Sequence, residues 1–176
     1  MILDSVHPLV KQRFELLQNK AQDSGIHIVP TQGLRTEAYQ HALWCRGRFL
    51  LDVVNAANKA AGIPNIADKE NRIVTWAKSA SVSFHGYGLA VDFGIMLPDS
   101  KLLTWEDKAD TDKDGLVDWD EVGGMADLFG FEWGGNFSNP DRPHLQLRIG
   151  WTIKSLIAAG IPAGVMFVAA HERGKS

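Results

Sequence analysis

The sequence predicts a single α+β fold in which a small antiparallel sheet is flanked by helices. Two observations carry this prediction: residues 4–23 and 36–48 place apolar side chains at helical spacing, and residues 89–95 and 144–149 alternate apolar and polar side chains as strands do. The chain has 176 residues, 45% of them hydrophobic, which is enough to bury one good core.

The first expected element is an amphipathic helix that runs to about Asp23. We expect Asp4 or Ser5 to cap its start and Gly25 to end it. A short strand at residues 26–29 follows.

A second amphipathic helix is expected to begin at Thr36 and Glu37 and to reach residues 46–48. After it the patterns predict a further helix, a strand at 89–95, an acidic loop, a helix, a strand at 144–149 and C-terminal helices.

The two alternating segments predict which side chains face the core. Asp92 shares its strand face with small residues only, and His144 lies on a polar face with Gln146 and Arg148. The opposite faces supply the candidate core residues Val91, Phe93, Ile95, Leu145, Leu147 and Ile149.

Two histidines and two aspartates on or near these strands predict a catalytic zinc site. Zinc in hydrolases takes three His or carboxylate ligands and leaves one position for water, and His85, Asp92 and His144 form such a set. The glycines in residues 86–88 can turn the chain so that His85 lies over the Asp92 face. Asp141, three residues before His144, is the expected general base.

These residues resemble the motifs of the LAS metallopeptidases. That family includes D-Ala-D-Ala dipeptidases and carboxypeptidases, and the L-alanyl-D-glutamate endopeptidases of phage endolysins. Its pattern Ser-x-His-x-x-Gly-x-Ala-x-Asp is met by Ser83, His85, Gly88, Ala90 and Asp92.

The second motif of the family is an acidic residue three positions before a histidine, here Asp141 and His144. With the preceding Trp133-Gly134-Gly135, this region looks most like the endolysin branch, in which Asp serves as base; the dipeptidase branch usually has Glu there. Trp133 is expected either to line the substrate cleft or to lie in the core.

A looser family motif lies upstream, where Arg35 and Thr36 are followed by Gln40 and Gly47-Arg48. The resemblance implies that Arg35 binds a substrate carboxylate or polarises the scissile carbonyl, and that Ser83 helps to hold substrate. A surface salt bridge is the alternative for Arg35. The resemblance covers roughly residues 5–150, so we assign the catalytic domain to residues 1–150.

Residues 110–121 match the EF-hand calcium loop and are inserted in this domain. Gly115 stands where that loop needs its sharp turn. The ligands expected are Asp110, Asp112, Asp114, the Leu116 carbonyl, Asp118 and Glu121. Because the loop lies between the two halves of the predicted zinc site, we expect calcium to activate the enzyme.

Composition excludes some partners. The net charge is −3 and basic residues are scattered without aromatic interleaving, so nucleic acid is not an expected partner, and we expect a monomer. Cys45 is the only cysteine, so an intrachain disulfide is impossible.

The N-terminus lacks the charged start and apolar run of a signal peptide. For an enzyme with a cell-wall substrate, this favours a phage protein that is made in the host cytoplasm and released by a holin to act on peptidoglycan in the periplasm.

Residues 151–176 are expected to form a helical extension packed on the same domain, with two short helices meeting at residues 160–162. The apolar run at residues 155–170 is short for a membrane span, and a weak membrane contact is the alternative.

The expected function is a zinc endopeptidase that cleaves peptidoglycan stem peptides between L-Ala and D-Glu. A D-Ala-D-Ala carboxypeptidase is the alternative enzyme. A metal-dependent wall-binding module without catalysis is the alternative of another class, which an intact Asp141 disfavours.

Overall fold

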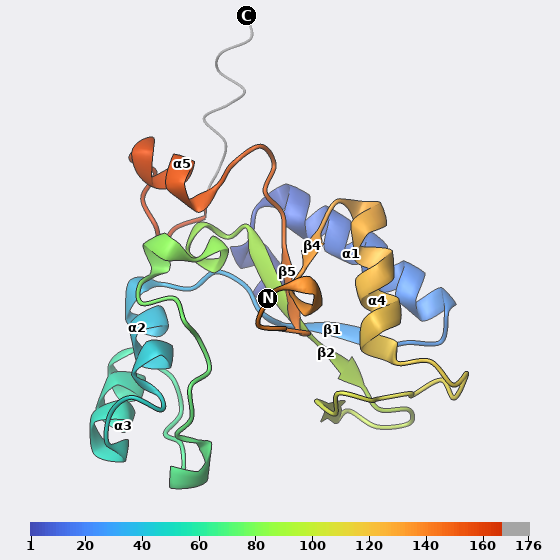
Figure 1. Cartoon of the computed structure of the whole chain (residues 1–176), viewed down its shortest axis with the longest axis horizontal. Helices are drawn as coiled ribbons and strands as arrows, with labels where there is room; N and C mark the ends of the chain where they lie inside the picture. The colour runs from blue at the N-terminus through green and yellow to red at the C-terminus, as the bar shows by residue number, and fades with distance from the viewer. Residues whose placement is uncertain (167–176) are drawn as a thin grey trace, which may run out of the picture.

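The computed structural model describes residues 1–166, and the α+β prediction is confirmed (Figure 1). Helices α1 and α4 pack together against a central sheet, while α2 and α3 form a separate arm. In chain order the elements are η1 (Ile2–Ser5), α1 (Pro8–Asp23), β1 (Ile28–Gln32), α2 (Glu37–Cys45), α3 (Leu51–Ala60), η2 (Asp68–Glu70), η3 (Ala80–Val82), η4 (Phe84–Tyr87), β2 (Ala90–Met96), β3 (Leu103–Thr104), α4 (Asp118–Ala126), η5 (Asp127–Phe129), β4 (Glu132–Trp133), η6 (Gly134–Asn136), β5 (His144–Gln146) and α5 (Ile153–Ala158).

Helix α1 starts later than its expected caps. Asp4 and Ser5 belong to the separate 3-10 turn η1, so the prediction that one of them caps α1 was wrong. The N-cap is His7, whose Nδ1 accepts a hydrogen bond from Leu9 N at 3.1 Å. Pro8 occupies the first helical position, where its fixed φ suits a helix and its missing N–H is not needed.

The other predicted helix boundaries agree better. Helix α1 ends at Asp23, and α2 begins after Thr36, whose Oγ1 accepts from Tyr39 N at 3.2 Å. Gly47 follows α2 with a positive φ of 70°, close to the expected end.

The strands pair antiparallel in the order β1-β2-β5-β4. The short strand β3 pairs with the C-terminal end of β2. Strand β1 begins two residues later than predicted, and β5 covers only the first half of residues 144–149. The sequence analysis missed β3 and β4, because two residues are too few to show alternation.

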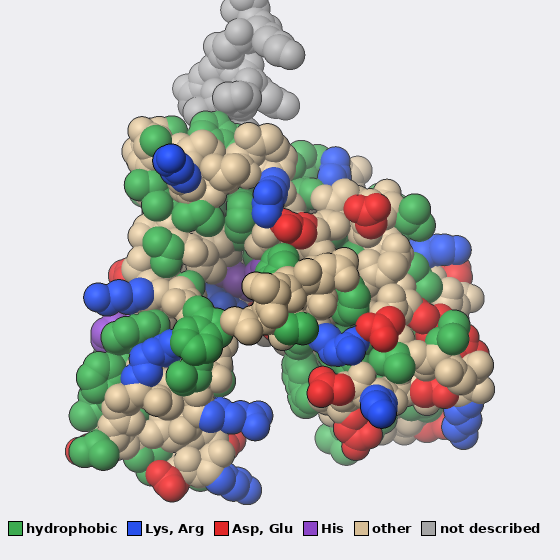
Figure 2. Space-filling view, viewed as in Figure 1, with side chains coloured by type: hydrophobic (Ala, Val, Ile, Leu, Met, Phe, Trp, Pro, Cys, Tyr) green, Lys and Arg blue, Asp and Glu red, His purple; other side chains and the backbone are tan. Residues whose placement is uncertain are grey.

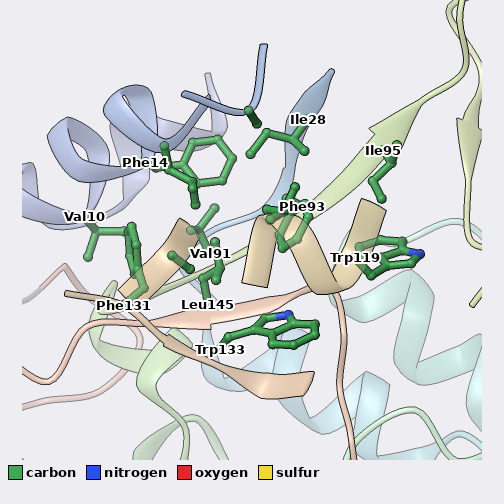
Figure 3. Packing of buried hydrophobic residues seen from close by; sticks show 14 of the residues in the cluster. Val10, Phe14, Ile28, Val91, Phe93, Ile95, Trp119, Phe131, Trp133 and Leu145 are labelled. Carbon is green, nitrogen blue, oxygen red and sulfur yellow. The ribbon is translucent and has the colours of Figure 1, made fainter. Parts of the chain in front are cut away.

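The main core lies between the sheet and helices α1 and α4, as Figure 3 shows. Helix α1 contributes Val10 and Phe14, and Trp119 of α4 packs on Phe93 of β2 with ring centroids 5.2 Å apart. Five of the six predicted core residues are buried there, and Ile149 is only partly buried because β5 ends before it.

A second core cluster forms where α5 packs on η4. Leu156 of α5 contacts the cluster of Phe84, Tyr87 and Leu89, and Gly164 N donates to Gly86 O at 2.6 Å. The described part of the C-terminal extension thus packs on the body that carries His85.

Residues 161–166, after Gly160, are not helical. The rest of the predicted second helix and of the apolar run, from residue 167 on, lies outside the described residues. Within residues 1–166, no helix is both long enough and apolar enough to cross a membrane.

Candidate metal centre and active site

The backbone brings three distant side chains to one point. In the ladder between β2 and β5, Asp92 lies directly opposite His144. His85 comes from η4, whose last residue is followed by Gly88 in the left-handed conformation, with φ 67°. Gly86 has no room for a side chain, since a Cβ there would lie 2.0 Å from the Ala80 oxygen. The predicted glycine turn over Asp92 is therefore present.

The three facing atoms form a nearly equilateral triangle. His85 Nε2 lies 3.0 Å from Asp92 Oδ1 and 3.1 Å from His144 Nδ1, and His144 Nδ1 lies 3.0 Å from Asp92 Oδ1. Ligand atoms around a tetrahedral zinc lie roughly 3.3 Å apart when the bonds are about 2.0 Å long. The separations of the three ligand atoms are therefore close to those around a zinc ion.

Hydrogen bonds on the far side of each ring decide where the imidazole protons are. His85 Nδ1 lies 2.8 Å from the Gly33 carbonyl oxygen, which can only accept, so this nitrogen carries the proton. His144 Nε2 lies 3.1 Å from Gln146 Oε1 and donates to it. The Gln146 amide is oriented in turn because its Nε2 donates to Glu132 Oε2 at 2.6 Å.

These tautomers leave bare lone pairs on His85 Nε2 and His144 Nδ1, both pointing at an Asp92 oxygen. Three acceptors converging without a proton repel one another unless a cation lies between them. The donor set of two imidazoles and a carboxylate, in which each ring also donates a hydrogen bond to an acceptor on its far side, therefore fits zinc.

The charge states of His85 and Asp92 agree with this arrangement, whereas the contact with Asp92 raises the pKa of His144, which burial alone would lower. Burial lowers the pKa of His85 to about 4, so the ring is neutral, as a metal ligand must be. Burial alone would raise the pKa of Asp92, but the adjacent His85 imidazole and the Arg35 guanidinium keep it well below its usual range. Asp92 is therefore ionised.

Arg35 is paired with a metal-ligand candidate. Its guanidinium donates to Asp92 Oδ2 at 2.5 Å, and only 14% of the side chain is exposed. It is therefore not the surface salt bridge considered from sequence. Its Nε is buried without a hydrogen-bond partner among the described residues, and the side chain also lines the cavity beside Asp92.

Asp141 lies at the edge of the same cavity. Its backbone closes a turn onto His144, whose N–H donates to the Asp141 carbonyl at 3.1 Å, and Asp141 N donates to Gly134 O. Partial burial, followed by the negative charge of Asp92, raises the pKa of the Asp141 carboxyl. A carboxylate that binds protons more readily than usual suits a general base.

Ser83 lines a second cavity together with Phe137, His144 and Gln146. Phe137 lines both cavities and packs on His144 with ring centroids 5.8 Å apart. Of the predicted metal ligands, Asp92 thus borders the first cavity and His144 the second.

Three residues with evident roles were not singled out as site residues in the sequence: Gly33, Glu132 and Gln146. A signal existed for Gln146, which stands two residues after His144 on the polar face of the same strand. Gly33 contributes only a backbone oxygen, and Glu132 lies in a strand that was not predicted. The sequence pattern therefore gave no indication of either role.

Trp133 does not line the cleft beside Asp92. It is buried in the main core, and its indole N–H donates to Arg142 O at 2.7 Å. Trp133 is therefore a core residue, which was the second of the two roles considered from the sequence.

The acidic loop has part of the expected EF-hand geometry. The oxygens of Asp110, Asp112 and Asp118 lie within 4.8 Å of one another, as do those of Asp112, Asp114 and Glu121. Gly115 has φ 90°, as the sharp turn requires. Helix α4 begins within the loop and continues beyond it, as the second helix of an EF-hand does. Residues 105–109, which precede the loop, are not helical, so the first helix of a full EF-hand is missing.

Comparison with known proteins finds relatives in sequence and in structure. The peptidase M15 family model described as D-alanyl-D-alanine carboxypeptidase matches residues 77–147. The peptidoglycan L-alanyl-D-glutamate endopeptidase CwlK of Bacillus subtilis (strain 168) is 34% identical over 143 residues, which cover 81% of this chain and 73% of the relative. A structural match is the crystal structure of a mutant of the vancomycin-resistance D,D-pentapeptidase VanY in complex with zinc. The match covers 86% of this chain and 83% of the VanY chain, with a TM-score of 0.45 and 18% sequence identity.

Proposed function

This chain belongs to the peptidase M15 family of LAS-type zinc peptidases, and from that premise we propose that it is an endopeptidase that cleaves peptidoglycan stem peptides between L-Ala and D-Glu. The observation that carries the proposal is the convergence of His85, Asp92 and His144 beside a cavity that Asp141 also lines.

Each residue has a part in the proposed reaction. Zinc, when bound, supplies a Lewis acid that polarises the scissile carbonyl and lowers the pKa of a water. Asp141 accepts the proton of the attacking water and passes it to the leaving amine. Arg35 keeps Asp92 ionised and, from the cavity wall, offers its guanidinium to a substrate carboxylate or carbonyl oxygen. Ser83, in the second cavity, contacts the rest of the peptide.

Two observations favour an endopeptidase over a carboxypeptidase. The curated relative CwlK is named for the L-alanyl-D-glutamate bond. In addition, one cavity is lined by Asp92 and Asp141 and a second by His144 and Ser83, and two cavities at one site can hold substrate on both sides of the scissile bond, as an endopeptidase requires. The family model is described by D-Ala-D-Ala cleavage, so the carboxypeptidase remains the second candidate.

The test is mass spectrometry of Gram-negative peptidoglycan digested with the zinc-loaded protein, beside His144→Ala and Asp141→Asn. Asp141→Asn has the same shape and leaves the metal ligands intact, so it separates loss of the base from loss of zinc. New D-Glu amino termini that need both residues would establish the endopeptidase.

Other products would point to other functions. Loss of terminal D-Ala alone would establish the carboxypeptidase. Metal-dependent wall binding with no product would leave the non-catalytic binding module.

We also propose that residues 110–121 bind calcium and that calcium activates the enzyme. Glu121 Oε2 is buried with no hydrogen-bond partner among the described residues, and burial raises the pKa values of Asp118 and Glu121, so a cation would relieve both carboxylates. Asp120 of α4 pairs with Arg142 at 2.5 Å, which connects the loop to the segment that bears Asp141.

The calcium proposal is tested by the rate at fixed zinc with and without calcium, in the wild type and in Glu121→Gln. Asp68→Asn, on the arm, is the matched control. We expect activation in the wild type and control but not in Glu121→Gln; equal rates with and without calcium would contradict the proposal.

For its biological setting we propose a phage endolysin that acts as a monomer in the periplasm after holin-mediated release. The resemblance of residues 133–144 to the endolysin branch supports this. Expression in Gram-negative cells should cause lysis only when a membrane pore is co-expressed; lysis without the pore would contradict it.

A further inference from the structure

We propose that the cavity beside Asp92 also binds the glycan of peptidoglycan, by stacking sugar rings on the indoles of Trp76 and Trp105. This inference rests on the proposed peptidoglycan substrate and deepens it, because it assigns the wall of the cleft to the sugar that precedes the stem peptide.

The two tryptophans come from distant parts of the chain but line one cavity of about 590 Å³, together with Arg35, Asp92 and Asp141. Trp76 lies in the segment that follows α3 and η2, and Trp105 follows β3. Figure 2 shows the molecule hollowed between the arm and the part that carries α4.

Both indoles are unusually exposed: 70% of Trp76 and 55% of Trp105 are accessible to water. Ile73 and Val74 on the same wall are 43% and 46% exposed. Clustered apolar side chains that remain in water at the entrance of a polar site indicate a binding surface.

Each ring is held by a neighbouring side chain while more than half of the residue remains exposed to water. The Arg48 guanidinium lies 5.4 Å from the Trp76 ring centre and 5.1 Å from that of Trp44, and it donates to Thr75 O at 3.0 Å. Trp105 stacks on the buried Trp119, with centroids 6.4 Å apart and planes 24° apart.

Fixed rings of this kind lose little conformational entropy when a ligand binds. The C–H face of a pyranose is apolar and flat, and stacking it on an indole removes apolar surface while the hydroxyls stay in water. A sugar therefore matches two exposed indoles better than an extended peptide does, because the backbone groups of a peptide need hydrogen-bond partners.

The position of the cavity also distinguishes the scissile bond. In peptidoglycan, L-Ala is joined directly to the lactyl group of the sugar, so the L-Ala–D-Glu bond lies one residue from the glycan, roughly 3.5 Å of extended chain. The terminal D-Ala–D-Ala bond lies four residues away, roughly 14 Å. A glycan site that shares a cavity with Asp92 and Asp141 therefore favours the first bond over the second.

The experiment compares two soluble substrates, a disaccharide-linked stem tetrapeptide and the same peptide with an acetyl group in place of the sugar. We expect the wild type to prefer the glycan-linked substrate in kcat/KM. Trp76→Ala and Trp105→Ala should each reduce that preference about tenfold, since a stacking contact together with its buried area is worth roughly that factor. The Phe substitutions should restore part of it.

Leu128→Ala is the matched control, because Leu128 is 73% exposed and does not line this cavity; it should keep the wild-type preference. Equal cleavage of both substrates by the wild type, or an equal loss on both substrates in the tryptophan variants, would overturn the inference. The first outcome leaves the endopeptidase itself established, so the two proposals fail separately.

If neither substrate were cleaved, the proposed function would fail, and calorimetric binding of the same two molecules would still decide the glycan site. Tighter binding of the glycan-linked molecule that Trp76→Ala removes would sustain it, and equal binding would overturn it.

Discussion

His85 and His144 show how single hydrogen bonds prepare the metal centre. Each ring donates one N–H away from the site, to the Gly33 carbonyl and to Gln146 Oε1, so that the other nitrogen faces Asp92 as a lone pair. The backbone carbonyl cannot be removed by mutation, but the Gln146 contact can, and it is therefore the sensitive point.

Gln146→Leu should weaken zinc binding by about 10–100-fold, because His144 loses the acceptor that selects its tautomer. Competition with a zinc-sensitive chelator measures the affinity. Unchanged affinity would show that the tautomer needs no support.

The matched control exchanges the two side chains, Gln146→Glu with Glu132→Gln. The exchange restores an acceptor for His144 and a donor–acceptor pair between the two positions. Zinc affinity should return most of the way to the wild-type value.

At the scale of elements, α4 is fitted closely to the segment that bears the general base. A Cβ on Gly123 of α4 would lie 2.2 Å from the Trp133 ring, so the helix and strand β4 touch directly. Trp133 donates to the Arg142 carbonyl, and the Arg142 guanidinium pairs with Asp120 of α4. Arg142, the residue after Asp141, is thus bonded to β4 through its backbone and to α4 through its side chain.

Asp120→Asn should lower kcat by roughly twofold to fivefold, since an exposed pair is worth up to about 1 kcal/mol. Zinc affinity should not change, because no metal ligand is touched. Steady-state kinetics on the soluble stem peptide give kcat, and Asp127→Asn, just beyond α4, is the control. A parallel loss of zinc would contradict this role.

The start of α1 predicts a pH dependence of stability. His7 caps the helix through its neutral Nδ1, and burial lowers its pKa. A histidine whose pKa is lower in the folded state stabilises the fold above its ordinary pKa of about 6.5, and this contribution is lost as the pH falls below that value.

His7→Asn keeps a capping oxygen that does not titrate. Between pH 6.5 and the lowered pKa, the wild type should therefore lose on the order of 1 kcal/mol relative to the variant. Urea unfolding of both proteins across this range measures the difference, and parallel pH curves would contradict the assignment.

At the scale of the whole molecule, two cores support the site from opposite sides. The main core fixes β2 and β5, and with them Asp92 and His144, while the smaller cluster under α5 fixes the turn that carries His85. The C-terminal segment up to residue 166 therefore contributes to the metal centre without touching it.

Leu156→Ala should cost about 2–5 kcal/mol of unfolding free energy, because the side chain is fully buried beneath α5. Ile157→Ala, on the same helix but 50% exposed, should cost less than about 0.5 kcal/mol. Denaturant unfolding measures both values. Equal costs would mean that α5 is not anchored through Leu156.

Local patterns predicted the long elements and failed at the short ones. Helices α1 and α2 and strand β2 are long enough for their periodicity to show, so their boundaries were nearly right. The cap of α1 was misplaced because a 3-10 turn uses Asp4 and Ser5 first, and β3 and β4 carry too few residues for a period.

The sequence by itself determined the candidate ligands, because the chemistry demands particular residue types at particular spacings and because strand alternation gives each one a face. Only the tertiary structure decided what surrounds these ligands. Its contributions are the hydrogen bond that His144 donates to Gln146, the ion pair of Arg35 with Asp92, and the position of Trp76 and Trp105 in one cavity. The physical reason is that these contacts depend on how sheet, arm and helices pack. The partners of Asp92 and the two walls of the cavity lie far apart in the chain. The periodicity of a helix or strand does not indicate which distant segment will pack against it.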